Sequence, residues 1–240
     1  MIKVNDILRS YSNFALEIEE LSLHPNSCIG LVGVNGAGKT TFLKALLDLI
    51  PLERGRILSF GNEVARSERW KDYTRAYIGE DFLLGYLRPK EYFRFYAGLY
   101  NRNPEEALAA AENLFPFIND SLLDGDKYIR ELSLGNKQRV GVASTLMLDA
   151  KVILLDEPFA NLDPISQNNL KQIIGQQLTD KIILISSHNL HHLREIATHF
   201  LLIDEGKLIK MTHNTEDSFR EIEQFFQSHP ANLKTKSSTA

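Results

Sequence analysis

A run of eight residues, Gly33-Val34-Asn35-Gly36-Ala37-Gly38-Lys39-Thr40, matches the pattern G-x-x-x-x-G-K-[ST] at every fixed position. Glycines let the backbone curl so that several N–H groups face one phosphate. Lys39 supplies a mobile positive charge for the outer phosphates, and the Thr40 hydroxyl is a suitable Mg²⁺ ligand. An apolar run at residues 28–32 precedes the eight residues, and helix-forming sequence follows at residues 41–49. The run therefore predicts a phosphate-binding loop that ends at the positive end of a helix.

Two neighbouring carboxylates, Asp156 and Glu157, end a second apolar run at residues 152–155. In an open parallel sheet, ligands collect at the carboxyl ends of the strands, so this pair is expected to lie beside the phosphates of the loop. There Asp156 would hold Mg²⁺ directly or through water. Glu157, one residue further, would face the terminal phosphate and polarise the attacking water as a general base.

The order of the expected elements around these residues predicts an α/β fold. Apolar runs typical of strands alternate with helix-like stretches, which implies a parallel sheet with helices on both faces. Residues 14–23 instead alternate between apolar and polar, as in a half-buried antiparallel strand. We expect a hairpin turn at residues 204–207 and a closing helix at residues 215–227. The expected strands are residues 14–23, 28–32, 56–60, 152–155, 182–185, 200–203 and 208–211.

The middle of the chain has helical periodicity. Residues 90–100 and 104–115 repeat apolar side chains at helical spacing, and Pro104 stands where helices commonly begin. The aromatic residues of the first stretch are expected to form the core of this insertion, because large aromatic side chains dominate packing. The expected organisation is one domain at 1–228, with core segments 1–81 and 150–228, a helical subdomain at 82–149, and a polar tail at 229–240.

Composition and charge exclude several classes of protein. The formal net charge is −4, so a nucleic-acid partner is not expected. Cys28 is the single cysteine, which excludes a disulfide framework and indicates a reducing compartment. No stretch approaches the roughly 20 apolar residues of a membrane span, and the first residues lack signal-peptide character. If the chain serves a membrane, another chain must provide the spanning part.

Three further segments narrow the class of nucleotide-binding protein. Leu132-Ser133-Leu134-Gly135-Asn136-Lys137-Gln138-Arg139 resembles the signature usually written LSGGQ and followed by Gln and Arg. Asn161-Leu162-Asp163 resembles a D-loop, and Ser187-His188 resembles a switch histidine. With the phosphate loop and the acidic pair in the same order, residues 3–211 resemble the ATP-binding cassettes of ABC transporters.

The resemblance implies an α/β fold of the P-loop NTPase (RecA-like) class, with a parallel-sheet core, an antiparallel β subdomain and an inserted α-helical subdomain. It implies an ATPase that uses ATP and Mg²⁺ and in which two chains enclose two ATP molecules. Tyr11 would stack on adenine, while Ser133 and Gly135 would touch the γ-phosphate held by the other subunit. Glu80 stands at the family's Q-loop position, which senses Mg²⁺ and contacts the membrane partner. The implied roles are nucleotide binding for Tyr11, Asn35, Gly36, Ala37, Gly38, Lys39, Thr40, Thr41, Ser133 and Gly135, catalysis for Lys39, Glu157 and His188, and metal binding for Thr40, Glu80 and Asp156.

The expected function is ATP hydrolysis that drives transport through a separate membrane-spanning permease. The chain would work as a homodimer or as a heterodimer with a second cassette, and it would be cytoplasmic and peripheral to the inner face of the cell membrane. Export of the bacterial ABC-2 kind is favoured, because Glu occurs at the Q-loop position of some exporter-type cassettes and the chain is expected to lack a C-terminal regulatory domain. The alternative is an ABC-type ATPase that acts on ribosomes or DNA. A P-loop kinase or another small NTPase would not explain residues 132–139 or His188.

Two features of the sequence leave questions open. Leu134 and Asn136 replace the usual Gly and Gln of the signature, and the bulk of Leu134 is expected to crowd the dimer interface. If hydrolysis were weak, Leu134 would be the first residue to test. Residues 82–87 are rich in large apolar side chains. They form either a docking groove for the membrane partner or part of the core of the helical subdomain.

Overall fold

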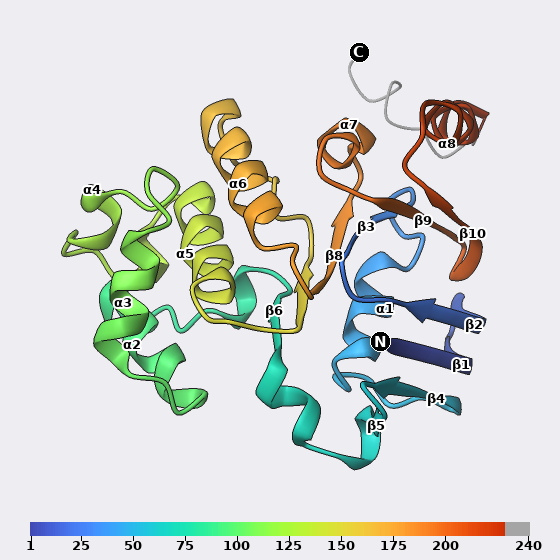
Figure 1. The fold of residues 1–240 in the computed structure, drawn as a ribbon, viewed down its shortest axis with the longest axis horizontal. Helices are drawn as coiled ribbons and strands as arrows, with labels where there is room; N and C mark the ends of the chain where they lie inside the picture. The colour runs from blue at the N-terminus through green and yellow to red at the C-terminus, as the bar shows by residue number, and fades with distance from the viewer. Residues whose placement is uncertain (229–240) are drawn as a thin grey trace.

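The computed structural model describes residues 1–228, so the expected polar tail at 229–240 lies outside the described residues. Ten strands of this part of the chain form one mixed sheet (Figure 1) in the order β5-β4-β1-β2-β10-β9-β3-β8-β7-β6. Its parallel strands are β6 (Thr74–Tyr77), β7 (Val152–Leu155), β8 (Ile182–Ser187), β3 (Ser27–Val32) and β9 (His199–Asp204). Its remaining strands are β1 (Ile2–Tyr11), β2 (Phe14–Leu23), β4 (Arg54–Ser59), β5 (Asn62–Glu63) and β10 (Lys207–His213).

Four of the parallel strands, β7, β8, β3 and β9, are built around apolar runs because both faces of this half of the sheet are buried, whereas β6 contains Arg75. Successive side chains of a strand point to opposite faces, so each strand contributes to two cores. One core joins the sheet to the helical subdomain and includes Ile153, Leu155, Ile183 and Ile185. The other core joins it to the first helix and the antiparallel strands and includes Val152, Leu154, Ile182 and Leu184. The three expected strands at residues 152–155, 182–185 and 200–203 are confirmed.

The antiparallel half begins with a long hairpin in which β1 pairs with β2, from Ile2 opposite Leu23 to Tyr11 opposite Phe14. The expected strand at 14–23 is confirmed, whereas β1 was not predicted because polar and acidic residues interrupt its apolar side chains. The predicted turn before β10 is also confirmed. Glu205 and Gly206 both have positive φ, 46° and 79°, as a tight two-residue hairpin loop requires.

The predicted helices at residues 41–49, 90–100, 104–115 and 215–227 are confirmed with shifts of a few residues at their ends, whereas the short helix α4 (Asp120–Leu123) was not predicted. Figure 1 shows α2 to α5 gathered as one group beyond β6, which is the expected helical subdomain. No helix of residues 1–228 is both long and apolar enough to cross a bilayer. The α-helices are α1 (Lys39–Leu46), α2 (Pro89–Leu99), α3 (Pro104–Glu112), α4 (Asp120–Leu123), α5 (Leu134–Leu146), α6 (Pro164–Gln176), α7 (Leu190–Arg194) and α8 (Glu216–Ser228). Short 3₁₀ turns are η1 (Val64–Arg66), η2 (Arg69–Tyr73), η3 (Glu80–Phe82) and η4 (Ile129–Glu131).

Some side chains of the apolar segment at residues 82–87 are buried in the core, and others are exposed where a partner could dock. Leu83, Leu84 and Leu87 pack against the core that contains the helical subdomain. Phe82 and Tyr86 instead expose 55% and 63% of their surface. The leucines therefore serve the core, and the two aromatic side chains remain available on the surface.

Cys28 lies in the middle of the sheet, and its chemistry gives a direct test of the fold. It is 1% exposed, and burial raises the pKa of its thiol to about 12. Because the thiolate is the nucleophile, iodoacetamide at pH 8 should leave Cys28 of the folded protein unmodified and alkylate it fully in denaturant, as mass spectrometry would show. Equal alkylation rates in both conditions would contradict this burial.

Candidate functional site

The phosphate loop connects β3 to α1, and the backbone conformation of its last glycine, Gly38, strongly favours glycine. Gly38 has φ +107°, and a Cβ atom there would lie 2.8 Å from Cζ of Phe14. Lys39 begins the helix and is only 7% exposed. Its Nζ donates to the carbonyl oxygens of Gly33 at 2.8 Å and Val34 at 3.3 Å. The pKa of Lys39 is lowered, because the effect of burial exceeds the opposing effect of the nearby Glu157 and Asp156 carboxylates.

A cavity of about 260 Å³ opens over this loop. Its walls combine the backbone curve of the loop with one carboxylate of the acidic pair, so the structure brings together two features that are distant in sequence. Ala37, by contrast, is buried, and its carbonyl oxygen accepts a hydrogen bond from the Gly206 amide at 2.9 Å. The residues that line the cavity are Phe14, Asn35, Gly36, Gly38, Lys39, Thr40, Thr41 and Glu157.

Asp156 lies against the phosphate loop, as predicted from its position at the carboxyl end of a parallel strand. The Thr40 hydroxyl donates to its Oδ2 at 2.6 Å, and the Ser186 hydroxyl donates to its Oδ1 at 2.5 Å. A hydroxyl and a carboxylate side by side are the hard oxygen donors that Mg²⁺ prefers. Within residues 1–228 there is no cluster of three His, Cys, Asp or Glu side chains that could hold a metal. The Thr40 hydroxyl and the Asp156 carboxylate fit Mg²⁺, which commonly binds through one or two side chains plus phosphates and waters.

Glu157 is held in an unusual backbone conformation at the rim of the same cavity. Its φ is +47°, a left-handed value that costs a non-glycine residue about 1–3 kcal/mol and tends to occur at active sites. Its amide donates to the Ser186 hydroxyl at 2.8 Å. Its carboxylate lies 2.8 Å from Nδ1 of His188 and 3.9 Å from Nζ of Lys39. The structure thus places the three residues predicted to be catalytic next to one another.

Two residues predicted to bind nucleotide or metal, Tyr11 and Glu80, do not line the cavity over the phosphate loop. Tyr11 is 44% exposed and does not line the cavity; its ring centroid is 6.1 Å from that of Phe14, which does. Glu80 forms an ion pair with Lys137 of α5, with Nζ and Oε2 3.3 Å apart. The Q-loop position is therefore linked to the helix that begins at the signature.

The signature residues open α5 on a different part of the chain. Ser133 is the N-cap residue, and its hydroxyl accepts a hydrogen bond from the Asn136 amide at 3.3 Å. Gly135 packs so closely against the D-loop that a Cβ atom would lie 2.5 Å from the Asn161 carbonyl oxygen. The Leu134 side chain is 52% exposed, so it does not fill space within this chain.

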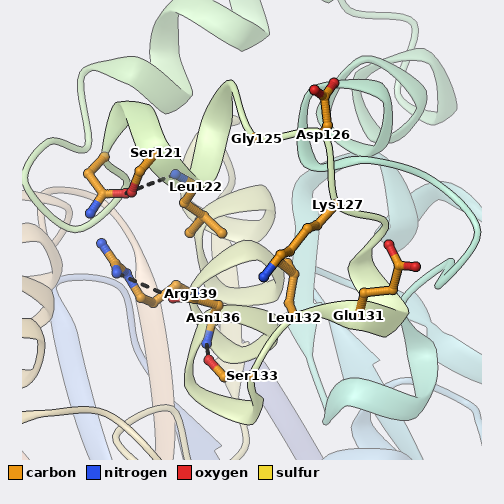
Figure 2. Close-up of a pocket in the computed structure, with 11 residues that line it drawn as sticks. Ser121, Leu122, Gly125, Asp126, Lys127, Glu131, Leu132, Ser133, Asn136 and Arg139 are labelled. Carbon is orange, nitrogen blue, oxygen red and sulfur yellow. Dashed lines mark hydrogen bonds between the residues drawn. The ribbon is translucent and has the colours of Figure 1, made fainter.

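A second cavity of about 560 Å³ lies beside Ser133, between α4 and the start of α5. Figure 2 shows the Lys127 side chain extending across it, with Asn136 and Arg139 on the α5 side. Arg139 is anchored there, because its guanidinium donates to the carbonyl oxygens of Phe117 at 2.5 Å and Pro116 at 3.3 Å. The phosphate loop and the signature thus border two different cavities.

Three side chains of this site were not predicted from the sequence. Phe14 lines the phosphate cavity, and Ser186 binds Asp156 and the backbone of Glu157. Gln138 of α5 donates from Nε2 to the Glu157 carbonyl oxygen at 2.8 Å. Ser186 gave a weak signal, since it is a polar residue at the end of an apolar strand, next to the switch histidine. Nothing in the local sequence of Phe14 or Gln138 indicates these contacts.

The known proteins reported below to which this chain is similar are ATP-binding proteins of transport systems or ATP-binding cassettes. An uncharacterized ABC transporter ATP-binding protein from Nostoc is 32% identical over 79% of this chain, which spans 57% of that relative's length. The nickel import system ATP-binding protein of Staphylococcus aureus is 28% identical, with 80% of this chain and 79% of the relative covered. A solved ATP-binding subunit of an ABC transporter has a TM-score of 0.79 at 21% identity, and each chain is fully covered. A dimeric cassette bound to ADP and Pi in a post-hydrolysis state has a TM-score of 0.76 at 16% identity, over 90% of this chain and 99% of that one.

The family model described as ABC transporter matches residues 16–160, which is more than half of the chain. The matched range includes the phosphate loop, the signature and the acidic pair, and the solved structures share the fold. These findings confirm the predicted α/β P-loop NTPase fold, the resemblance and the assignment to an ATPase family. The chain belongs to the ABC transporter family, as one of its ATP-binding cassettes.

Proposed function

We propose that two copies of this chain bind two ATP molecules between them and that hydrolysis drives transport through a separate membrane-spanning permease. The observation that carries this proposal is the position of Glu157. Its carboxylate contacts His188 at 2.8 Å and lines the cavity that the phosphate loop forms. A carboxylate at that rim can reach a water molecule next to a terminal phosphate.

The residues around the loop divide the chemistry between them. Lys39 and the loop amides bind the phosphates, while Thr40 and Asp156 would hold Mg²⁺, which neutralises phosphate charge when bound. Glu157 takes a proton from water as the water oxygen bonds to the γ-phosphorus. The bond from the γ-phosphorus to the β,γ-bridging oxygen breaks, so ADP and inorganic phosphate leave. His188 holds the Glu157 carboxylate and contacts the γ-phosphate.

The signature hollow supports a dimer in which each ATP is completed by the partner. Ser133, Gly135 and the cavity beside them are built on α5, whereas the phosphate loop is on α1. Two apolar side chains near the signature and D-loop, Leu134 and Ile165, are 52% and 72% exposed. Exposed apolar groups gain from burial in an interface. We propose that the second copy covers them and brings its nucleotide to Ser133.

The permease partner has a suitable surface between the core and the helical subdomain. An apolar cavity of about 440 Å³ lies there between the end of α1 and the end of α2. Leu49 and Leu99 at its walls are 50% and 60% exposed. We propose that a permease segment docks here.

We propose that the direction of transport is export, which the presence of Glu80 supports. A transport assay in inside-out vesicles that showed ATP-driven loss of substrate from the lumen would contradict that direction.

The dimer is tested by changing the signature serine. Ser133→Arg should block closure of the partner's nucleotide and lower ATP turnover about 100-fold, the scale of losing transition-state contacts to one group. Binding of a fluorescent ATP analogue should remain, because Ser133 does not line the phosphate cavity of its own chain. Ser228→Arg at the end of α8 is the matched control and should keep wild-type turnover. Wild-type turnover in Ser133→Arg would exclude a role for the signature in the partner's site.

A further inference from the structure

Glu157 is held by both subdomains of the chain at once. Its amide donates to Ser186 at the end of β8, in the core. Its carbonyl oxygen accepts from Nε2 of Gln138, which belongs to α5 of the helical subdomain. Because Glu157 has φ +47°, the peptide groups on either side need such contacts to keep this conformation. The orientation of the carboxylate therefore depends on an element outside the core.

The Gln138 amide is itself fixed by a second hydrogen bond. Tyr77, at the end of β6, donates its hydroxyl to Oε1 of Gln138 at 2.9 Å. Gln138 and Tyr77 are both buried, at 7% and 4% exposure. Burial raises the pKa of Tyr77, with the nearby Glu80 carboxylate adding to the shift, so the phenol stays protonated and remains a donor. A carbonyl oxygen can only accept, so Nε2 must be the amide atom that faces Glu157.

We propose that Gln138, oriented by Tyr77, is the residue that positions the general base Glu157. The inference rests on the proposed function, because it concerns the base of that reaction. Gln138 lies on the same helix as Ser133, and the neighbouring Lys137 pairs with Glu80. Seating of α5 on the core thus forms the Gln138 bond, and displacement of α5 breaks it. The base is competent when helix α5 and strand β6, which carries Tyr77, are both in place.

Gln138 contacts the backbone carbonyl oxygen of Glu157 and not its carboxylate, so the contact acts through the backbone. Gln138 does not line the phosphate cavity, so ATP binding should not depend on it. Losing the bond should lower kcat about 10-fold, the scale of one buried hydrogen bond, with KM changed less than about two-fold. A residue with only a packing role would not separate kcat from KM in this way.

The test compares Gln138→Met, which keeps the length of the side chain without its donor, with Tyr77→Phe, which keeps the ring without its hydroxyl. Tyr77→Phe should lower kcat about three-fold, since it loosens the Gln138 amide without removing it. Gln172→Met on the exposed face of α6 is the matched control and should match wild type. Thermal melts establish that each variant is folded, and Tyr77→Phe decides the question if Gln138→Met does not fold.

A double-mutant cycle with Glu157→Gln separates this inference from the proposed function. In single turnovers, Gln138→Met should slow the wild-type chain but add almost nothing once the base is gone, because both changes affect one group. Multiplicative effects would overturn the positioning role while leaving Glu157 as the base. An unchanged kcat in both Gln138→Met and Tyr77→Phe would also overturn it. Wild-type hydrolysis in Glu157→Gln itself would remove the base and, with it, both proposals.

Discussion

Replacing Lys39 with alanine should weaken ATP binding by about 100-fold or more, the largest effect on affinity expected for a single side chain here. The Nζ group is held over the loop by the Gly33 and Val34 carbonyl oxygens, so it lies close to where the phosphates would bind. Hydrogen bonds to charged groups are worth about 1.5–3 kcal/mol each, and an ammonium group that faces two phosphates makes more than one. Isothermal titration of ATP into the purified variant measures the loss directly.

Lys44 provides the matched control for this experiment. It lies on the same helix as Lys39, one turn and a half further on, and does not line the phosphate cavity. Lys44→Ala should therefore bind ATP with wild-type affinity. If Lys39→Ala also retained wild-type affinity, residues 33–40 would not be the phosphate-binding loop.

Replacing Glu157 with glutamine should lower the rate of ATP hydrolysis about 10²–10⁴-fold, the range expected when a general base is lost. The amide keeps the shape of the side chain and can still hydrogen-bond His188, but it cannot take the proton from water. ATP binding should persist, because Lys39 and the loop are unchanged. The variant should therefore accumulate as an ATP-bound dimer in MgATP, visible by light scattering as twice the 27.3 kDa of the chain.

Glu112 offers a control of the same chemistry in the helical subdomain. It is an exposed carboxylate in α3, so Glu112→Gln should hydrolyse ATP at the wild-type rate. The two readouts of Glu157→Gln report on different parts of the proposal. Retained hydrolysis would exclude Glu157 as the base. Slow hydrolysis by a protein that stays monomeric in MgATP at high concentration would instead contradict closure of two chains around the nucleotide.

The position of Leu134 bears on how tightly such a dimer closes. Its side chain is exposed in the single chain, so its bulk is accommodated without cost until a partner approaches. The neighbouring Ser133 and Gly135 keep the hydroxyl and the backbone amide that a phosphate requires. Leu134→Gly removes the bulk of the side chain and keeps the Ser133 hydroxyl and the Gly135 amide.

The sequence by itself determined the features that are local in the chain. The phosphate loop is a contiguous strand, turn and helix, so its residue types specify its shape without reference to the rest of the fold. Asp156 and Glu157 were placed beside it by a general rule, since the carboxyl ends of parallel strands share one edge. The helices of the helical subdomain were also predicted from a local pattern, because helical periodicity and a proline at the first helical position can be recognised within about ten residues.

The tertiary structure alone decided the contacts made by side chains that are far apart in sequence. β6 was not predicted, because Arg75 interrupts its short apolar run, although the arginine is buried and donates to the carbonyl oxygens of Lys71, Asp72 and Thr74. Phe14 reaches the phosphate cavity only because the β1–β2 hairpin packs over the loop.

Gln138 gives the clearest case of a contact that no local pattern encodes. Glu157 is 19 residues further along the chain, and Gln138 reaches it only because α5 packs across the ends of β6 and β7. Local residue types fix which backbone forms a loop or a helix. The distance between two side chains on different elements is instead set by how all the elements pack, and that depends on the whole core at once.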